Sequence, residues 1–259
     1  MSFDVIFKNT NITNEDSSFS ADIGVKDGKI SEIGNLKDFS DNVIDLTNLT
    51  LIPGVIDSQV HFREPGAEHK EDLNSGTKAA ILGGVTAVFE MPNTDPSTTN
   101  FNALKDKFSR AEKRSFCDYA FYVGGTVDNS DELPFLEKVE GCCGVKVFMG
   151  LSTGSLLVSG DDDLDKILSK INHRASFHSE DQDSLEDRKK YRVTGDTNSH
   201  EIWRNDEQCF IATKRLINLA RKHNKNVHVL HVSTAQEIEL LSQNKDIASV
   251  EITPQHLTL

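Results

Sequence analysis

The chain has 259 residues, with 28 lysines and arginines against 41 aspartates and glutamates, so its formal net charge is −13. This charge argues against a nucleic-acid-binding protein, because phosphate contacts need clustered lysine and arginine, and against binding to an anionic membrane surface. No apolar run approaches the roughly 20 residues of a membrane span, and the N-terminus lacks the basic start and apolar core of a signal peptide. Four cysteines in so long a chain do not make a disulfide scaffold, so we expect a reduced cytoplasmic protein with all four thiols as packing residues.

The first 52 residues predict a small β domain. Asp27-Gly28 lies between two apolar runs, which is a strong hairpin signal. Short, closely spaced strands of this kind indicate a small N-terminal β-sandwich part, residues 1–52. The expected strands are 5–9, 22–26, 29–33, 43–46 and 49–52.

After Pro53 the pattern changes to β-rich runs that alternate with segments of helical period. The expected strands are 54–62, 85–91, 119–123, 145–149, 175–178, 227–232 and 249–253, and the expected helices are 75–82, 101–114, 131–139, 162–172, 201–223 and 234–242. This alternation predicts an α/β fold with a parallel sheet, namely a (β/α)8 TIM-type barrel in residues 53–259 with about seven of its eight strands. The polar segment 180–200 is expected to be a loop.

Three histidines stand at the carboxyl ends of different expected strands. In such a barrel these ends meet at one mouth, so His61, His178 and His231 are expected to project into one cavity. Neutral imidazoles there suit Zn²⁺. His228 and His231 are three residues apart and face opposite sides of a strand, so we select His231, which is nearer the strand end. The other histidines are interpreted as structural or solvent-facing residues; they are His69, His173, His200, His223, His228 and His256.

Lys146 is unusual because apolar neighbours place it inside a buried strand. Burial of an ammonium is costly unless the group is paired or neutral. A neutral amine can react with CO₂ to give an anionic carbamate, which can bridge two metal ions. The alternative is a buried lysine that pairs with aspartate or glutamate.

Arg63 and Asn93 follow the first two barrel strands and are candidate substrate-binding residues. The planar fork of arginine binds a carboxylate through two hydrogen bonds, and Asn93 could add a donor. The alternative for Arg63 is an ion pair at the surface or between domains. Because the chain is acidic overall, an anionic substrate needs a local positive feature or a metal.

Three motifs resemble dihydroorotases of the amidohydrolase superfamily. The first runs from Asp57 to Gly66 and contains Val-His-Phe-Arg-Glu-Pro-Gly. The second is Met91-Pro-Asn-Thr94, and the third is His231-Val-Ser-Thr-Ala235. The resemblance covers essentially the whole chain and implies an amidohydrolase barrel.

The resemblance also implies an activity and roles for the site residues. The activity is the reversible hydrolysis of dihydroorotate to N-carbamoyl-aspartate, with one or two zinc ions that lower the pKa of water and polarise the carbonyl. Arg63 and Asn93 match residues that hold the substrate carboxylate. The matching metal ligands are His61, Lys146 as a carbamate, His178 and His231.

Two departures from the family pattern matter. The family's first strand usually carries His-x-His, whereas Gln59 stands at the first of these positions here, which weakens one of two metal positions. Some members of the family carry glutamine there. The family's catalytic aspartate belongs to an eighth strand, so it is expected beyond residue 259. We expect the 259-residue chain alone to be less stable than a complete one, prone to self-association or dependent on a second fragment, and also catalytically poor.

Two alternatives stay open. One is another cyclic amidohydrolase, such as a dihydropyrimidinase, hydantoinase or allantoinase, which Lys146 suits equally well. The other is a non-catalytic dihydroorotase-like scaffold for aspartate transcarbamoylase, which Gln59 favours. If the protein is either kind of enzyme, its partner is a small-molecule substrate. We also expect a homo-oligomer such as a dimer.

Overall fold

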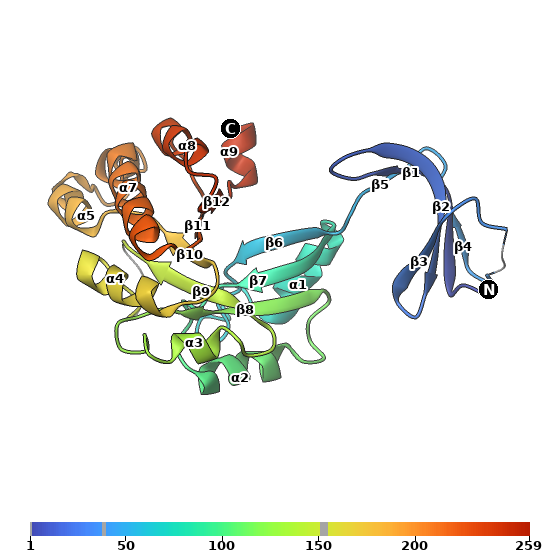
Figure 1. Ribbon diagram of the computed structural model, residues 1–259, viewed down its shortest axis with the longest axis horizontal. Coiled ribbons are helices and arrows are strands. Elements are labelled where there is room, and N and C mark those ends of the chain that lie inside the picture. The colour runs from blue at the N-terminus through green and yellow to red at the C-terminus, as the bar shows by residue number, and fades with distance from the viewer. Residues whose placement is uncertain (1, 38–39, 151–154) are drawn as a thin grey trace. The chain divides into compact units, whose positions relative to one another are not determined.

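The computed structural model describes residues 2–37, 40–150 and 155–259. The chain divides into two compact units, Met1–Val55 and Ile56–Leu259. Each unit is built on its own sheet (Figure 1). All the candidate site residues belong to the second unit.

The first unit is a five-stranded sheet among its described residues. Its strands are β1 (Val5–Thr13), β2 (Ser18–Lys26), β3 (Lys29–Gly34), β4 (Val43–Asp45) and β5 (Thr50–Leu51), in the order β3-β2-β1-β4, with β5 also paired to β1. The expected hairpin joins β2 and β3, and both of its loop residues have positive φ, 50° at Asp27 and 70° at Gly28. β4 and β5 run parallel to β1, so the sheet is mixed. The β2–β3 hairpin intervenes along the chain, which gives the connection that a parallel pair needs.

The second unit is a parallel sheet covered by helices. Its strands are β6 (Val55–Val60), β7 (Val85–Glu90), β8 (Asp118–Gly124), β9 (Cys142–Phe148), β10 (Ala175–His178), β11 (Val227–Val229) and β12 (Ala248–Val250). Its helices are α1 (Leu73–Leu82), α2 (Phe101–Ala111), α3 (Leu133–Leu136), α4 (Asp161–Lys170), α5 (Gln182–Arg188), the 3₁₀ helix η1 (Lys189–Tyr191), α6 (Ser199–Trp203), α7 (Asp206–His223), α8 (Ala235–Ser242) and α9 (Pro254–Thr258).

The seven strands of this sheet follow one another in chain order, from β6 at one edge to β12 at the other, which confirms the predicted α/β barrel fold with seven strands (Figure 1). The sheet curls so strongly that side chains from its two edges meet. Ser58 on β6 donates a hydrogen bond of 2.7 Å from its Oγ to Oε2 of Glu251, which follows β12. The carboxyl ends of the strands therefore converge on one mouth, as in a barrel.

The main core lies between the strands and the helices that cover them. Helix α7 buries Ala212, Leu216 and Ala220, which lie on one face of the helix, and they join the same apolar cluster as Val145 and Phe177 of the sheet. The strands β9 and β10 are buried almost throughout, which explains why they appear in the sequence as continuous apolar runs.

The segment 180–200 differs from the expected loop. It contains α5, η1 and the start of α6. Asp181 caps α5, because its carboxylate accepts a hydrogen bond of 3.0 Å from the backbone N–H of Ser184, and Leu185 is the one buried residue of that helix. A helix with a single buried side chain leaves no periodic apolar pattern in the sequence.

The four cysteines, Cys117, Cys142, Cys143 and Cys209, are all free thiols and partly buried, in agreement with their expected role in packing. Among the residues that the structure describes, no helix is both long and apolar enough to cross a bilayer.

Candidate metal and substrate site

His178 and His231 lie side by side at the carboxyl ends of β10 and β11. The two strands are paired in parallel, with Phe177 opposite Val229, which brings the residues that follow to the same edge. The distance from His178 Nδ1 to His231 Nε2 is 3.0 Å. Burial lowers the pKa of His178 and lowers that of His231 to about 3. Both imidazoles are therefore neutral at pH 7, the form that binds metal ions.

Glu180 and Arg204 hold the His178 ring from its other side. His178 Nε2 lies 3.1 Å from Oε2 of Glu180, and Nε of Arg204 donates a hydrogen bond of 2.7 Å to Oε1 of the same carboxylate. Burial opposes ionisation of Glu180, but the hydrogen bonds from His178 and Arg204 outweigh it and lower the pKa of Glu180 to about 2. The ionised carboxylate accepts a hydrogen bond from Nε2–H, which leaves the lone pair of Nδ1 directed at His231.

Sequence reasoning did not identify Glu180 or Arg204. Glu180 stands two residues after His178 at a strand end, and this position was a usable signal. Arg204 precedes α7 and reaches Glu180 only through the tertiary fold, so no spacing in the sequence marks it.

Lys146 is buried within β9, with only 1% of its surface exposed. Its Nζ makes no hydrogen bond to any described residue and lies 4.5 Å from the ring centre of Phe148. Burial lowers its pKa well below the usual value for lysine, and the charge of Glu251 offsets only part of this effect. Burial therefore favours the neutral form of the amine, and no hydrogen bond from a described residue stabilises the charged form.

His61 connects this group to the expected carboxylate-binding residues. Burial lowers its pKa to about 4, while a hydrogen bond with Asn93 acts in the opposite direction. The positive charge of Arg63 also lowers the pKa of His61.

Arg63 and Asn93 line one pocket of about 370 Å³. Lys70 also lines it and adds a second cation that sequence reasoning did not identify. His178 and His231 line a separate pocket of about 440 Å³ together with Glu180 and Arg204. Arg63 and Asn93 thus line one pocket and His178 and His231 another, while His61 and Lys146 are not among the lining residues of either.

The chemistry of these residues fits a metal ion in part. Among the described residues, no three His, Cys, Asp or Glu side chains converge closely enough to hold a metal. However, two neutral imidazole nitrogens lie 3.0 Å apart, and the buried Nζ of Lys146 has no hydrogen-bonding partner. Nitrogen donors of this kind suit Zn²⁺, and a carbamate on Lys146 would add an oxygen donor.

Comparison with known proteins gives the family. The amidohydrolase family model matches residues 50–256, and the chain belongs to this family. The chain is 36% identical to the dihydroorotase of Pyrococcus abyssi, over 92% of this chain and 53% of the relative. It is 31% identical to the allantoinase of Salmonella choleraesuis, over 92% of this chain and 55% of the relative.

Solved structures agree with this family and fold. An L-hydantoinase (dihydropyrimidinase) from Arthrobacter aurescens superimposes with a TM-score of 0.91 at 29% identity, over 99% of this chain and 60% of that chain. The chain spans slightly more than half the length of the curated relatives that it matches.

Proposed function

We propose that this protein is a zinc-dependent dihydroorotase, which reversibly hydrolyses dihydroorotate to N-carbamoyl-aspartate in pyrimidine biosynthesis. The observation that carries the proposal is the pocket where Arg63, Lys70 and Asn93 meet. Asp95 also lines the pocket, so the two cations leave it with a net positive charge. This charge and the amide of Asn93 suit a substrate with a free carboxylate, which a hydantoin or dihydrouracil ring does not have. His61 forms a hydrogen bond with Asn93, one of the residues that line this pocket.

In this proposal the chain's own residues bind and orient the substrate and hold one or two metal ions. Arg63 and Asn93 bind the substrate carboxylate, and His61, Lys146, His178 and His231 hold the zinc. Zinc supplies Lewis acidity, which lowers the pKa of water and polarises a carbonyl. Glu180, fixed by Arg204, keeps His178 in the tautomer with a free Nδ1. We further propose that residues 53–259 carry this chemistry, that residues 1–52 form a separate β part, and that the protein is a cytoplasmic homo-oligomer such as a dimer.

The second candidate is a cyclic amidohydrolase for an uncharged ring, such as a hydantoinase or dihydropyrimidinase. The similarity to hydantoinase structures and the buried neutral Lys146 favour it. Comparison of dihydroorotate with dihydrouracil distinguishes the two, because these rings differ only in the carboxylate. Tighter binding of dihydroorotate supports the dihydroorotase, whereas equal binding or a preference for dihydrouracil supports the second candidate.

We expect Arg63→Lys to weaken the binding of N-carbamoyl-L-aspartate by about 10- to 100-fold. The substitution keeps the charge but removes the planar fork, and one charge-assisted hydrogen bond contributes about 1.5–3 kcal/mol. Titration calorimetry on the zinc-loaded chain measures the effect. N-carbamoyl-β-alanine, which lacks the α-carboxylate, is the matched ligand and should bind wild type and variant alike. An unchanged affinity for N-carbamoyl-L-aspartate would exclude this role for Arg63.

We expect Lys146 to be carbamylated when the chain is supplied with bicarbonate and Zn²⁺. Its neutral amine attacks CO₂ and forms a C–N bond, and the displaced proton passes to solvent, which leaves an anionic carbamate. Nuclear magnetic resonance with ¹³C-bicarbonate should show one carbamate signal. Lys146→Met, a buried substitution of similar size, should abolish that signal. Persistence of the signal in Lys146→Met, or no signal in wild type, would contradict this assignment.

A further inference from the structure

Arg63, the proposed carboxylate-binding residue, has an unusual backbone conformation. Its φ is +65°, in the left-handed region that side chains with a β-carbon disfavour. A residue stays in this region only when surrounding contacts hold it there. The contacts around the loop that follows β6 therefore show what orients Arg63.

One side of this loop is held by the segment after β7. The backbone N–H of Asp95 donates a hydrogen bond of 3.0 Å to the carbonyl of Pro65. Gly66 lies so close to Asp95 that a β-carbon on it would be 2.3 Å from the Asp95 carbonyl oxygen. The backbone N–H of Ala67 also returns to the carbonyl of Arg63 at 3.0 Å. These contacts fix the loop, but none of them involves the side chain of Glu64, which lies between Arg63 and Pro65.

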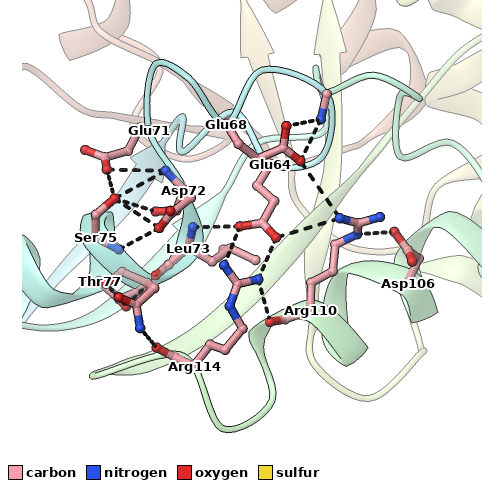
Figure 2. Close-up of polar contacts among 12 residues, drawn as sticks. Glu64, Glu68, Glu71, Asp72, Leu73, Ser75, Thr77, Asp106, Arg110 and Arg114 are labelled. Carbon is pink, nitrogen blue, oxygen red and sulfur yellow. Dashed lines mark hydrogen bonds and ion pairs between the residues drawn. The ribbon is translucent and has the colours of Figure 1, made fainter.

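Glu64 fixes the opposite side of the loop (Figure 2). Its carboxylate is buried, with 3% exposure, and accepts a hydrogen bond of 3.0 Å from the backbone N–H of Leu73, the first residue of α1. The two terminal nitrogens of Arg114, beyond the end of α2, donate to the two carboxylate oxygens at 2.6 and 3.1 Å. Glu64 thus joins the loop to the N-terminus of one helix and to the segment that follows another.

Stability alone is a poor explanation for this arrangement. The Arg114 side chain is 40% exposed, and an ion pair with an exposed partner contributes little to stability. The ion pair instead fixes the orientation of the Glu64 side chain, because the planar guanidinium of Arg114 binds the carboxylate through two hydrogen bonds. The residue next to Glu64 in the chain is Arg63, which lines the pocket with Asn93.

We propose that Glu64 and Arg114 form a positioning pair that holds Arg63 in its left-handed conformation, so that the Arg63 fork is presented to the substrate carboxylate. This inference rests on the proposed function, because it assumes that Arg63 reads that carboxylate. Neither Glu64 nor Arg114 touches the substrate. Their effect on binding passes through the orientation of Arg63, and it is therefore confined to ligands that carry the α-carboxylate.

The test compares two ligands in three variants of the zinc-loaded chain. Glu64→Gln and Arg114→Met should each weaken the binding of N-carbamoyl-L-aspartate by at least about tenfold, because small misplacements of an orienting group have large effects. Binding of N-carbamoyl-β-alanine should stay within about twofold. Arg110→Gln is the matched control, because Arg110 lies 3.7 Å from the same carboxylate and is also paired with Asp106 at the surface. It should leave both affinities within about twofold.

Each outcome has one meaning. A selective loss for N-carbamoyl-L-aspartate in Glu64→Gln and Arg114→Met supports the positioning pair. An equal loss for both ligands shows a merely structural role, and unchanged affinities for both ligands show no role; either result overturns the inference. If Glu64→Gln does not fold, as judged by circular dichroism, Arg114→Met decides the question, because it leaves the Leu73 hydrogen bond in place. If wild type itself does not prefer N-carbamoyl-L-aspartate, the proposed function fails first and the inference fails with it.

Discussion

Replacement of His178 by alanine should weaken the binding of Zn²⁺ to this chain by at least about 100-fold. Loss of a residue that merely orients a metal ligand already reduces affinity by about 10- to 100-fold, and loss of the ligand itself removes a bond to the metal. In His178→Ala, His231 would keep its imidazole but lose the partner nitrogen that lies 3.0 Å away. Competition with a chromophoric zinc chelator measures the affinity.

The control for this experiment is His223→Ala. His223 lies on α7, where its Nε2 is 2.8 Å from a carboxylate oxygen of Asp165, so it reports on adventitious zinc binding at a histidine–aspartate pair. We expect its removal to leave the high-affinity zinc unchanged. Elemental analysis of the wild-type chain, incubated with Zn²⁺ and bicarbonate, gives the stoichiometry. A wild-type chain without stoichiometric zinc, or equal affinities in wild type and His178→Ala, would contradict the metal site.

The sequence predicted the positions of the site residues where strand ends determine them. Parallel strands bring their carboxyl ends to one edge of the sheet, so His178 and His231 were expected to be neighbours before their distance was known. The same reasoning placed Arg63 and Asn93 on adjacent strands, and they line one pocket. For these residues, the apolar runs that precede them in the sequence predict where each strand ends and therefore where the residue lies.

Sequence patterns did not predict contacts that depend on how helices return to the sheet. Arg204 binds Glu180 from a segment 24 residues away, and Arg114 binds Glu64 from 50 residues away. Neither pair has a fixed spacing, and each arginine resembles a surface residue in the sequence. Charged side chains that pair inside a fold carry no periodic signal, so only the structure identifies them.

Lys107 shows this limit most clearly. It lies on α2 at the helical spacing that follows Leu104 and precedes Ala111, and all three residues are buried. Its Nζ is fully buried and forms an ion pair with Glu90, at the end of β7. It also donates a hydrogen bond of 2.8 Å to the carbonyl of Met91. The pair therefore supports the strand end immediately before Asn93.

We expect Lys107→Met to destabilise the chain by about 3–5 kcal/mol, because removal of one partner leaves Glu90 as an uncompensated buried charge. Burial already raises the pKa of Glu90 and lowers the pKa of Lys107, so each group depends on the other to stay ionised. Urea unfolding, monitored by circular dichroism, measures the free energy of unfolding of the variant against wild type.

The double variant Glu90→Leu/Lys107→Met provides the decisive comparison. It removes both charges, so no buried charge is left unpaired, and well-packed apolar replacements of a buried ion pair are often neutral or stabilising. We therefore expect the double variant to be more stable than Lys107→Met alone, with an interaction free energy of about 0.5–3 kcal/mol between the two sites. Strictly additive effects would show that the two side chains contribute independently. In that case Lys107 would act through its hydrogen bond to Met91 and its packing against Phe121, whose ring centre lies 5.4 Å from Nζ.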